Sequence, residues 1–356
     1  MSPDGAARDP AELLRLLRRE AGLDLIALEP TAAGESGNVY WATDRAGEVL
    51  LLKLMHGPVP AGLSYLRALT AVVARLHERG YPAPLVRAVG QAAGLVFWIQ
   101  ERADGTTLVS PAGRPDADRI MAALPELIRL NDAQAGLGTG PGDAGTNDFS
   151  PGDAAAGDPC PGSPARSSWP DLIRQTLTEG GDGYCRPETL AGRADARDLL
   201  AVLRRVADSC CGAVPAAADF VHYDFSPWNL LGSTGQGSAS SDSASPGSAR
   251  SDGGAAITAV IDINPPILAG DRAFDLATLL FYCYEHDGVR RRLWTRLLEL
   301  ADTRAARAYL AHMVLRQADW SLRFYPDAEH TRHYLGLARR VAADIDDGAL
   351  VDSAGA

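Results

Sequence analysis

The residues best placed to do chemistry lie in one short stretch, residues 220–231, with the sequence FVHYDFSPWNLL. It contains His222, then Asp224, then Asn229 five residues further on, with apolar residues on both sides. This pattern predicts a loop between two short strands. In such a loop an aspartate can contact a substrate hydroxyl while the asparagine ligates magnesium, as in phosphoryl transfer. We expect His222 to support the loop by hydrogen bonding rather than to act as a base; the alternative is a chance match in an ordinary loop.

A second aspartate, Asp262, follows in the hydrophobic run AVIDIN. A strand that delivers one carboxylate is what a phosphoryl-transfer site needs to hold Mg²⁺ against nucleotide phosphates. A Gly- and Ser-rich tract occupies most of the chain between Asp224 and Asp262, and without it a tight strand, turn and strand remain. Taken alone, Asp262 would be an aspartate in a turn. Its order after the first motif favours a metal ligand.

A third element lies near the start of the chain, where GESGN separates two strand-like runs. A glycine-containing hairpin can bring backbone N–H groups and a serine hydroxyl close to phosphates, and Gly34, Ser36 and Gly37 would do so here. Lys53 closes the next run, LLLKLM, where its charge can reach the phosphates. A plain hairpin and a surface lysine are the alternatives. Lys53 is the only lysine of the chain, which favours a functional role.

The elements that must position these residues can be read from the periodicity. Asp9 followed by Pro10 predicts the start of a short leading helix. Three short β-type runs follow within residues 25–55, then an amphipathic helix over about 64–79, and then two more strand-like runs up to residue 102. Everything after about Asp104 is mainly helical. The pattern predicts an α+β chain whose five-stranded antiparallel sheet precedes the helical part.

Two segments interrupt this organisation. Residues 138–168 and 232–256 are rich in Gly, Ser, Ala, Pro and Asp, and the second has no aromatic or large aliphatic residue. Such compositions cannot support a core of their own. We expect flexible surface insertions, with regulatory lids as the alternative.

Composition excludes several classes of protein. Of the 356 residues, 46% are hydrophobic and 22% are charged, which is ordinary for a soluble globular protein. A net charge of -11 argues against a nucleic-acid partner and mildly favours a cationic ligand. The five cysteines include no CxxC pair, so neither a disulfide framework nor a zinc site is expected. Without an apolar run long enough to span a bilayer or a leader-like start, we expect a cytoplasmic protein with no membrane partner.

Taken in order, these motifs and the later segment GDRAFDLATLLFY resemble the aminoglycoside phosphotransferase family of protein-kinase-like small-molecule kinases. The resemblance spans roughly residues 25–285. It implies a bilobal protein-kinase-like fold. The N-lobe, residues 1–103, would bind nucleotide, and the mainly helical C-lobe, residues 104–356, would carry the catalytic loop and the substrate-binding helices.

The resemblance also implies roles for individual residues, with ATP or GTP and Mg²⁺ in the cleft. Asp224 would orient or deprotonate the acceptor hydroxyl, and Asn229 and Asp262 would bind the metal. Lys53 would hold phosphates. The nucleobase would meet backbone groups around three consecutive residues, Gln100, Glu101 and Arg102. Two further acidic residues of the GDRAFDLA segment are expected to be structural, the later one as a cap of the helix that it opens: Asp271 and Asp275.

The sequence departs from the family pattern at three places. The helix after Lys53 usually carries a glutamate that pairs with the lysine, but here it has only Glu78 near its end. The partner of Lys53 is therefore unassigned, with Glu35 or another group as the candidates. Tyr223 stands where a glycine is usual between His222 and Asp224. After Asp262 the usual aromatic residue is replaced by the run INPP.

The acceptor would be held by the C-terminal helices. Their carboxylates and aromatic rings suit a cationic, hydroxylated molecule through charge and cation–π contacts. The alternative is a solvated helix face with a packed tryptophan. The residues concerned are Glu285, Asp287, Asp319, Trp320, Tyr325 and Asp327.

We therefore expect a phosphotransferase that uses ATP or GTP and acts on a hydroxyl of a small molecule, such as an aminoglycoside or another cationic antibiotic. One alternative is a metabolic kinase for a sugar, an amino alcohol or a natural-product intermediate. Another is a catalytically weak nucleotide-binding module, although the presence of Asp224, Asn229 and Asp262 together disfavours it. A protein kinase is disfavoured because no APE-type segment follows the metal strand. The oligomeric state is left open.

Overall fold

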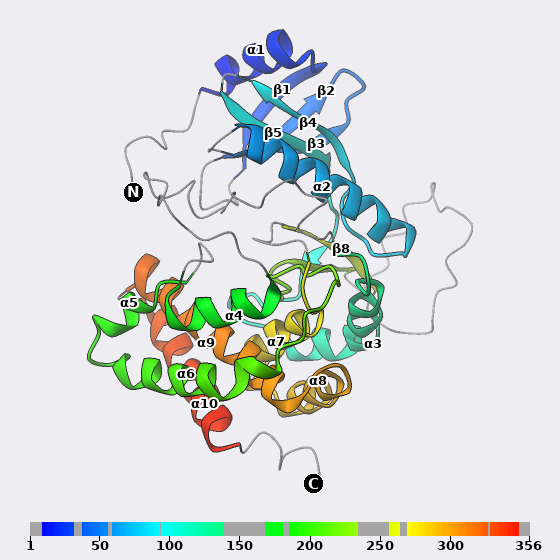
Figure 1. Ribbon diagram of the computed structural model, residues 1–356. Coiled ribbons are helices and arrows are strands. Elements are labelled where there is room, and N and C mark those ends of the chain that lie inside the picture. Colours follow the sequence, from blue (N-terminus) through cyan, green and yellow to red (C-terminus); the bar gives the residue numbers. More distant parts are fainter. Residues whose placement is uncertain are drawn as a thin grey trace.

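A sheet-bearing part comes first in the chain and a helical part follows it. In space, the short strand β8 (Ile257–Val260) lies between the two parts (Figure 1). This is a computed structural model, and it describes residues 9–31, 38–55, 59–92, 94–138, 168–180, 185–233, 256–263, 269–326 and 328–348. The predicted fold class, an α+β chain with a five-stranded antiparallel sheet before mainly helical chain, is confirmed.

Five antiparallel strands form the sheet, in the order β1-β2-β3-β5-β4. Every strand-like run predicted within residues 25–102 is present. The strands are β1 (Leu25–Pro30), β2 (Val39–Asp44), β3 (Val49–Met55), β4 (Val86–Ala92) and β5 (Leu95–Glu101).

The alternation of side chains along β3 decides where Lys53 points. Leu52 and Leu54 are buried in a core that they share with α1 (Pro10–Ala21). Lys53 lies between them, so its side chain projects from the opposite face of the sheet. On the neighbouring strand β5, Trp98 pairs with Lys53 in register. The sequence pattern of one strand thus separates a core face from a face that can meet a ligand.

Helix α1 begins and ends at residues that favour helix ends, and α2 is followed by one. Asp9 accepts a hydrogen bond from the N–H of Ala11 at 3.1 Å, and Gly22 ends α1 with a left-handed φ of 66°. Helix α2 (Val59–Glu78) begins before the predicted residue 64 and is followed by Gly80, whose φ is 71°. The predicted leading helix and its cap are confirmed.

The helical part is built around α9 (Thr303–Phe324), which contacts helices on all sides and is buried along most of its length. Its tyrosine, alanine, leucine and valine residues join one large core. The helices around it are α4 (Trp169–Thr178), α5 (Pro187–Ala191), α6 (Arg197–Cys210), α7 (Ala273–Tyr282), α8 (Asp287–Leu300) and α10 (Glu329–Asp347), while α3 (Ala117–Ala133) packs on α7 and α8.

A second, three-stranded sheet frames the loop that carries Asp224. It contains β6 (Thr106–Thr107), β7 (Leu230–Gly232) and β8 in that order. The strands on either side of the Gly- and Ser-rich tract, β7 and β8, pair antiparallel as predicted. This pairing brings Asn229, just before β7, close to the residues that follow β8.

Several predictions fall on residues outside the described ranges. The predicted insertions, 138–168 and 232–256, lie there almost entirely, as do Gly34, Ser36 and Gly37. The predicted boundary between the lobes, at residues 103 and 104, falls in the link between β5 and β6 and stays a prediction. Within the described parts of the chain, no helix combines the length and apolar character needed to cross a membrane.

Candidate active site

The loop of residues 221–229 is shaped by short hydrogen bonds within itself. The N–H of Ser226 donates to the carbonyl of Asp224 at 2.8 Å, and the N–H of Asn229 donates to the carbonyl of Ser226 at 2.9 Å. Just before the loop, Asp219 pairs with Gly270 as an isolated bridge. The loop is therefore held at its start by this bridge and at its end by β7. We refer to it below as the 221–229 loop.

His222 lies inside this loop and is almost completely buried. Its Nδ1 accepts a hydrogen bond from the N–H of Asp224 at 3.3 Å, which leaves Nε2 to donate to the carbonyl of Ile261 at 2.9 Å. Burial lowers the pKa of His222, which favours this neutral form. The ring thus joins the 221–229 loop to the chain just before Asp262. It is a support for both acidic residues.

The Asp224 carboxylate is held at both oxygens. Oδ1 receives Nη2 of Arg316 at 2.9 Å, and Oδ2 accepts a hydrogen bond from Nδ2 of Asn229 at 2.9 Å. The side chain of Asp224 keeps 35% of its surface exposed. A fixed and accessible carboxylate can receive a hydrogen bond from a hydroxyl brought to it.

Lys53 and Asp262 form an ion pair that joins the two parts of the chain. Nζ of Lys53 lies 2.6 Å from Oδ1 of Asp262 and 5.5 Å from the centre of the Trp98 ring. The lysine side chain is only 12% exposed, whereas that of Asp262 is 51% exposed. The nearby ammonium lowers the pKa of Asp262. Lys53 therefore pairs with the aspartate of the predicted metal strand, and Glu78 lies at the far end of α2.

Asn229 and Asp262 offer oxygen atoms of the kind that magnesium prefers. The N–H of Ile261 donates to the carbonyl of Asn229 at 2.9 Å, so the residue before Asp262 lies against Asn229. Nδ2 of Asn229 is used by the carbonyl and the carboxylate of Asp224, which leaves Oδ1 as its ligating atom. Among the described residues, no three His, Cys, Asp or Glu side chains are grouped to hold a metal. One carboxylate and one amide oxygen nevertheless fit Mg²⁺, which takes most of its other ligands from substrate phosphates and water.

Two residues of the site have left-handed backbone conformations. Tyr223 has φ 69° and Asp262 has φ 60°, and these are the non-glycine residues with positive φ in the described chain. Such a conformation costs about 1–3 kcal/mol and persists only where surrounding contacts hold it. Strained positions of this kind concentrate at functional sites, and here they occur beside Asp224 and at the predicted metal ligand.

Asp275 holds the backbone of the 221–229 loop by hydrogen bonds from α7. Its carboxylate is fully buried and accepts hydrogen bonds from the N–H of His222 at 2.8 Å, the N–H of Tyr223 at 2.9 Å and the side chain of Gln134 at 2.8 Å. The expectation that it caps its own helix is wrong, because the N–H of Ala273 is taken by Asp271 instead, at 2.9 Å. Burial raises the pKa of Asp275 to about 7.

The three residues predicted at the nucleobase site lie at the end of β5, and their side chains are engaged within the protein. Gln100 is buried and accepts a hydrogen bond from Nε1 of Trp98 at 3.1 Å. Glu101 pairs with Arg87 at 2.6 Å. The Arg102 guanidinium lies 5.5 Å from the centre of the Trp41 ring. Because these side chains have partners, it is the backbone that would serve a nucleobase.

The predicted cluster of carboxylates for a cationic acceptor is not assembled in the described chain. Asp319 is fully buried and paired with Arg323 at 2.8 Å, so its carboxylate faces a cation inside the fold and not a ligand. Asp287 pairs with Arg290 at 2.8 Å, and Asp327 lies outside the described residues. Glu285 is paired as well, with Arg340. Each of the three described carboxylates of the set therefore has an arginine partner of its own.

The aromatic members of that set do gather at the junction of α9 and α10. Trp320 lies with its ring centre 5.1 Å from that of Tyr325 and 6.0 Å from that of Phe324. Tyr325 and Phe324 are 40% and 55% exposed. An exposed aromatic cluster can therefore meet a ligand here through ring faces rather than through charge.

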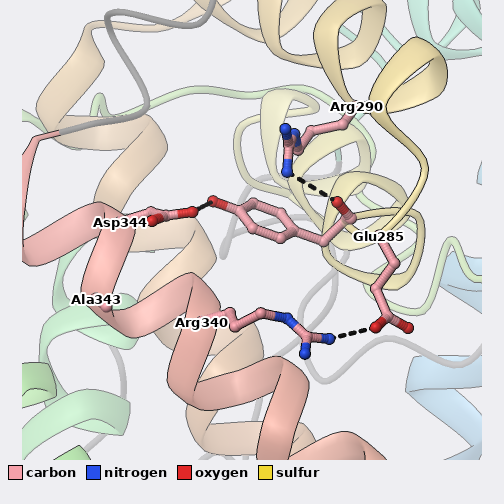
Figure 2. A pocket seen from close by; sticks show the side chains of 6 residues that line it. Glu285, Arg290, Arg340, Ala343 and Asp344 are labelled. Atoms are coloured by element: carbon pink, nitrogen blue, oxygen red, sulfur yellow. Dashed lines mark hydrogen bonds and ion pairs between the residues drawn. The ribbon is translucent and has the colours of Figure 1, made fainter.

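A pocket of about 370 Å³ lies between the end of α7, α8 and α10 (Figure 2). Its charged groups have partners: Arg340 donates to Glu285, the hydroxyl of Tyr284 donates to Asp344, and Arg290 pairs with Asp287. Its lining residues are Tyr284, Glu285, Arg290, Arg340, Ala343 and Asp344. Neither a residue of the 221–229 loop nor Asp262 is among them.

Sequence reasoning missed Arg316, the residue that pairs with Asp224. Its signal was an arginine within LAHMVLRQADW, a stretch of α9 that is otherwise largely buried. A charge in such a stretch needs a partner. The partner is the catalytic candidate itself.

The fold is shared with solved phosphotransferase structures. A Thermobifida fusca protein described as a fructosamine-3-kinase is 19% identical, with 95% of this chain and 99% of that chain covered and a TM-score of 0.51. The aminoglycoside phosphotransferase APH(3'')-Id of Streptomyces rimosus is 18% identical over 85% and 96% of the two chains, with a TM-score of 0.50. A macrolide 2'-phosphotransferase of type I is 15% identical over 92% and 95%, also with a TM-score of 0.50. At this identity the similarity shows the fold alone.

The sequence places the chain more narrowly than the fold does. No curated protein matches it at a significant level. Residues 27–239, more than half of the chain, match the phosphotransferase enzyme family known as APH, which confirms the resemblance found in the motifs. The chain therefore belongs to the APH phosphotransferase family, whose members transfer a phosphoryl group to a hydroxyl acceptor.

Proposed function

We propose that the protein transfers the γ-phosphoryl group of ATP or GTP to a hydroxyl of a small molecule, with Asp224 as the residue that receives the hydroxyl. The observation that carries this proposal is the fixed Asp224 carboxylate, joined through Asn229 to the side of the site where Asp262 and Lys53 pair. Phosphoryl transfer needs an oriented nucleophile on one side and charge stabilisation on the other.

The chemical step follows from these positions. The acceptor hydroxyl donates its hydrogen bond to Asp224, which fixes the oxygen in line with the γ-phosphorus. A bond forms between that oxygen and phosphorus while the bond from phosphorus to the β–γ bridging oxygen breaks, the proton passes to Asp224, and the nucleoside diphosphate leaves. Lys53, which projects beside the Trp98 ring, holds the phosphates.

Mg²⁺ fits Oδ1 of Asn229 and the carboxylate of Asp262. When bound, it would neutralise the charge of the nucleotide phosphates. The Asp262 carboxylate would then contact two cations, the Lys53 ammonium and Mg²⁺. About half of the Asp262 side chain is exposed, and this part is available for the metal. His222 keeps this carboxylate and Asp224 in a fixed relation through the Ile261 carbonyl.

The nucleobase would meet the backbone that follows β5. The carbonyl of Asp104 accepts a hydrogen bond from the hydroxyl of Thr258 at 2.6 Å, which ties this link to β8. Gly105, with φ 135°, lets this link approach β8 closely, since a Cβ at this position would lie 2.4 Å from Oγ1 of Thr258. The link between the two parts is therefore held in place, which suits a surface that receives a planar base.

The acceptor is a small hydroxylated molecule, and both antibiotics and metabolites are candidates. A cationic antibiotic was the first expectation, but three of the carboxylates that favoured it, Asp319, Asp287 and Glu285, are each paired with an arginine. The exposed rings of Tyr325 and Phe324 favour an acceptor with an apolar or planar face. Because its phosphoryl donor would be a cellular nucleotide, we place the activity in the cytoplasm.

The test is a mass-spectrometric screen for the gain of one phosphoryl group. Aminoglycosides, macrolides, fructosamines, simple sugars and amino alcohols would be incubated with ATP or GTP and Mg²⁺. We expect a product that disappears with Asp224→Ala and persists with Asp302→Ala, which changes an exposed aspartate at the start of α9. Full turnover by Asp224→Ala would refute the role of that residue. Nucleotide binding without any product would favour the nucleotide-binding module.

A further inference from the structure

We infer that Arg316 is a positioning residue for phosphoryl transfer: it acts through Asp224 and transmits the position of α9 to the 221–229 loop. The inference rests on the proposed function. Two adjacent residues of the loop are gripped by one guanidinium, since Nη2 lies 2.9 Å from Oδ1 of Asp224 and Nη1 donates to the carbonyl of Tyr223 at 2.5 Å. The planar fork of an arginine fixes both acceptors relative to each other.

The same helix also holds the Tyr223 side chain. Its hydroxyl lies 2.8 Å from Nε2 of His312, which is one helical turn before Arg316. The Tyr223 ring stacks on Phe274 with centres 5.1 Å apart and planes 19° apart, and the Arg316 guanidinium lies 5.1 Å from its centre. Two residues of α9 therefore contact Tyr223: His312 contacts its hydroxyl, and Arg316 contacts its ring and its carbonyl.

This grip matters because Tyr223 has a left-handed backbone, with φ 69°, which a side chain disfavours. A tyrosine here does not settle in this conformation by local preference. Contacts from Asp275 on its N–H and from Arg316 on its carbonyl hold it. The direction in which the next residue, Asp224, leaves the backbone is thus set by α7 and α9.

Removing Arg316 would leave the Asp224 carboxylate with one anchor. Asn229 would still donate to Oδ2 at 2.9 Å, but Oδ1 would be free to rotate with the side chain. Arg316 is itself only 12% exposed at its side chain, so it is held by packing. A displacement of the group that orients the nucleophile lowers the rate of transfer without weakening nucleotide binding.

The experiment compares Arg316→Met, Arg316→Lys and the control Arg296→Met. Arg296 is a similarly buried arginine, 21% exposed at its side chain, that pairs with Asp132 of α3 at 2.6 Å. We expect Arg316→Met to lower kcat about 10- to 100-fold, with the Kd for nucleotide changed by less than about twofold. Arg316→Lys should recover part of the rate, because an ammonium keeps the charge but not the fork. The control should leave kcat unchanged.

A double-mutant cycle separates action through Asp224 from direct contact with the substrate. In an Asp224→Asn background, Arg316→Met should lower the residual rate by less than about twofold. An equal loss in both backgrounds would mean that Arg316 contacts a reacting group, and unchanged kcat in Arg316→Met would mean that it positions nothing. Either result overturns the inference while the proposed function stands.

A second readout needs no substrate. The urea midpoints of Asp224→Asn, Arg316→Met and the double variant would each be compared with the midpoint of the wild-type chain. We expect the shift caused by Arg316→Met to shrink when Asp224 is already replaced. Additive shifts would show that the two side chains are not coupled and would overturn the inference, even if the wild type phosphorylates none of the acceptors tested. The latter result would count against the proposed function alone.

Discussion

Replacing Asp275 with asparagine tests how the fold holds the 221–229 loop. This carboxylate is fully buried, and burial raises its pKa to about 7 from an ordinary value of 3.8. Between these two values the folded chain binds a proton that the unfolded chain has released. The stabilising contribution of Asp275 is therefore complete below about pH 4 and is lost as the pH rises through about 7.

The size of the effect follows from the shift. A difference of about three pKa units corresponds to about 4 kcal/mol, of which about 3 kcal/mol falls between about pH 5 and about pH 8. Asp275→Asn does not titrate. It also leaves one loop N–H facing an amide group, but that penalty is the same at every pH. The free energy of unfolding of the wild type, minus that of the variant, should thus fall as the pH rises.

The assay is urea unfolding followed by tryptophan fluorescence, repeated from about pH 5 to about pH 8. Asp302→Asn is the matched control, because a hydrogen bond from the N–H of Arg304 lowers the pKa of that exposed carboxyl and moves its titration below the range. Its difference from the wild type should stay constant. A difference for Asp275→Asn that changes by less than about 1 kcal/mol over the range would refute the reasoning.

Three further outcomes are expected. Burial lowers the pKa of His222, so the contribution of this residue to stability should be lost as the pH falls below about 6.5. The free energy of unfolding of the wild type, minus that of His222→Asn, should therefore fall over this range in urea titrations, opposite in sign to the difference for Asp275→Asn. Gly105→Ala should destabilise the chain by about 1–3 kcal/mol in urea, because its Cβ would meet Thr258 at 2.4 Å; an unchanged midpoint would contradict this packing. Asp319→Ala should lower stability by about 3 kcal/mol, because it removes the buried carboxylate that pairs with Arg323, and should not change the KM for the acceptor. A raised KM with an unchanged urea midpoint would return Asp319 to the acceptor site.

The sequence determined the features that depend on neighbours along the chain. Asp9 and Pro10 favour a helix start at this position, and the alternation around Lys53 specifies which face of its strand the lysine takes. The hydrogen bonds that join Asp224 to His222 and to Asn229 are likewise local, because they link residues at most five apart. The order of these motifs was also enough to place the chain in its family.

Only the tertiary structure decided which distant groups meet. Lys53 pairs with Asp262 across 209 residues of chain, and Arg316 donates to Tyr223 across 93. Asp275, which looked like a helix cap, instead accepts the N–H groups of the 221–229 loop. Such contacts depend on how whole helices and sheets pack, since a side chain's partner is set by the angle and depth of its element in the core. The residues that can do the chemistry are therefore visible in the sequence, whereas the residues that hold them in place are fixed by packing.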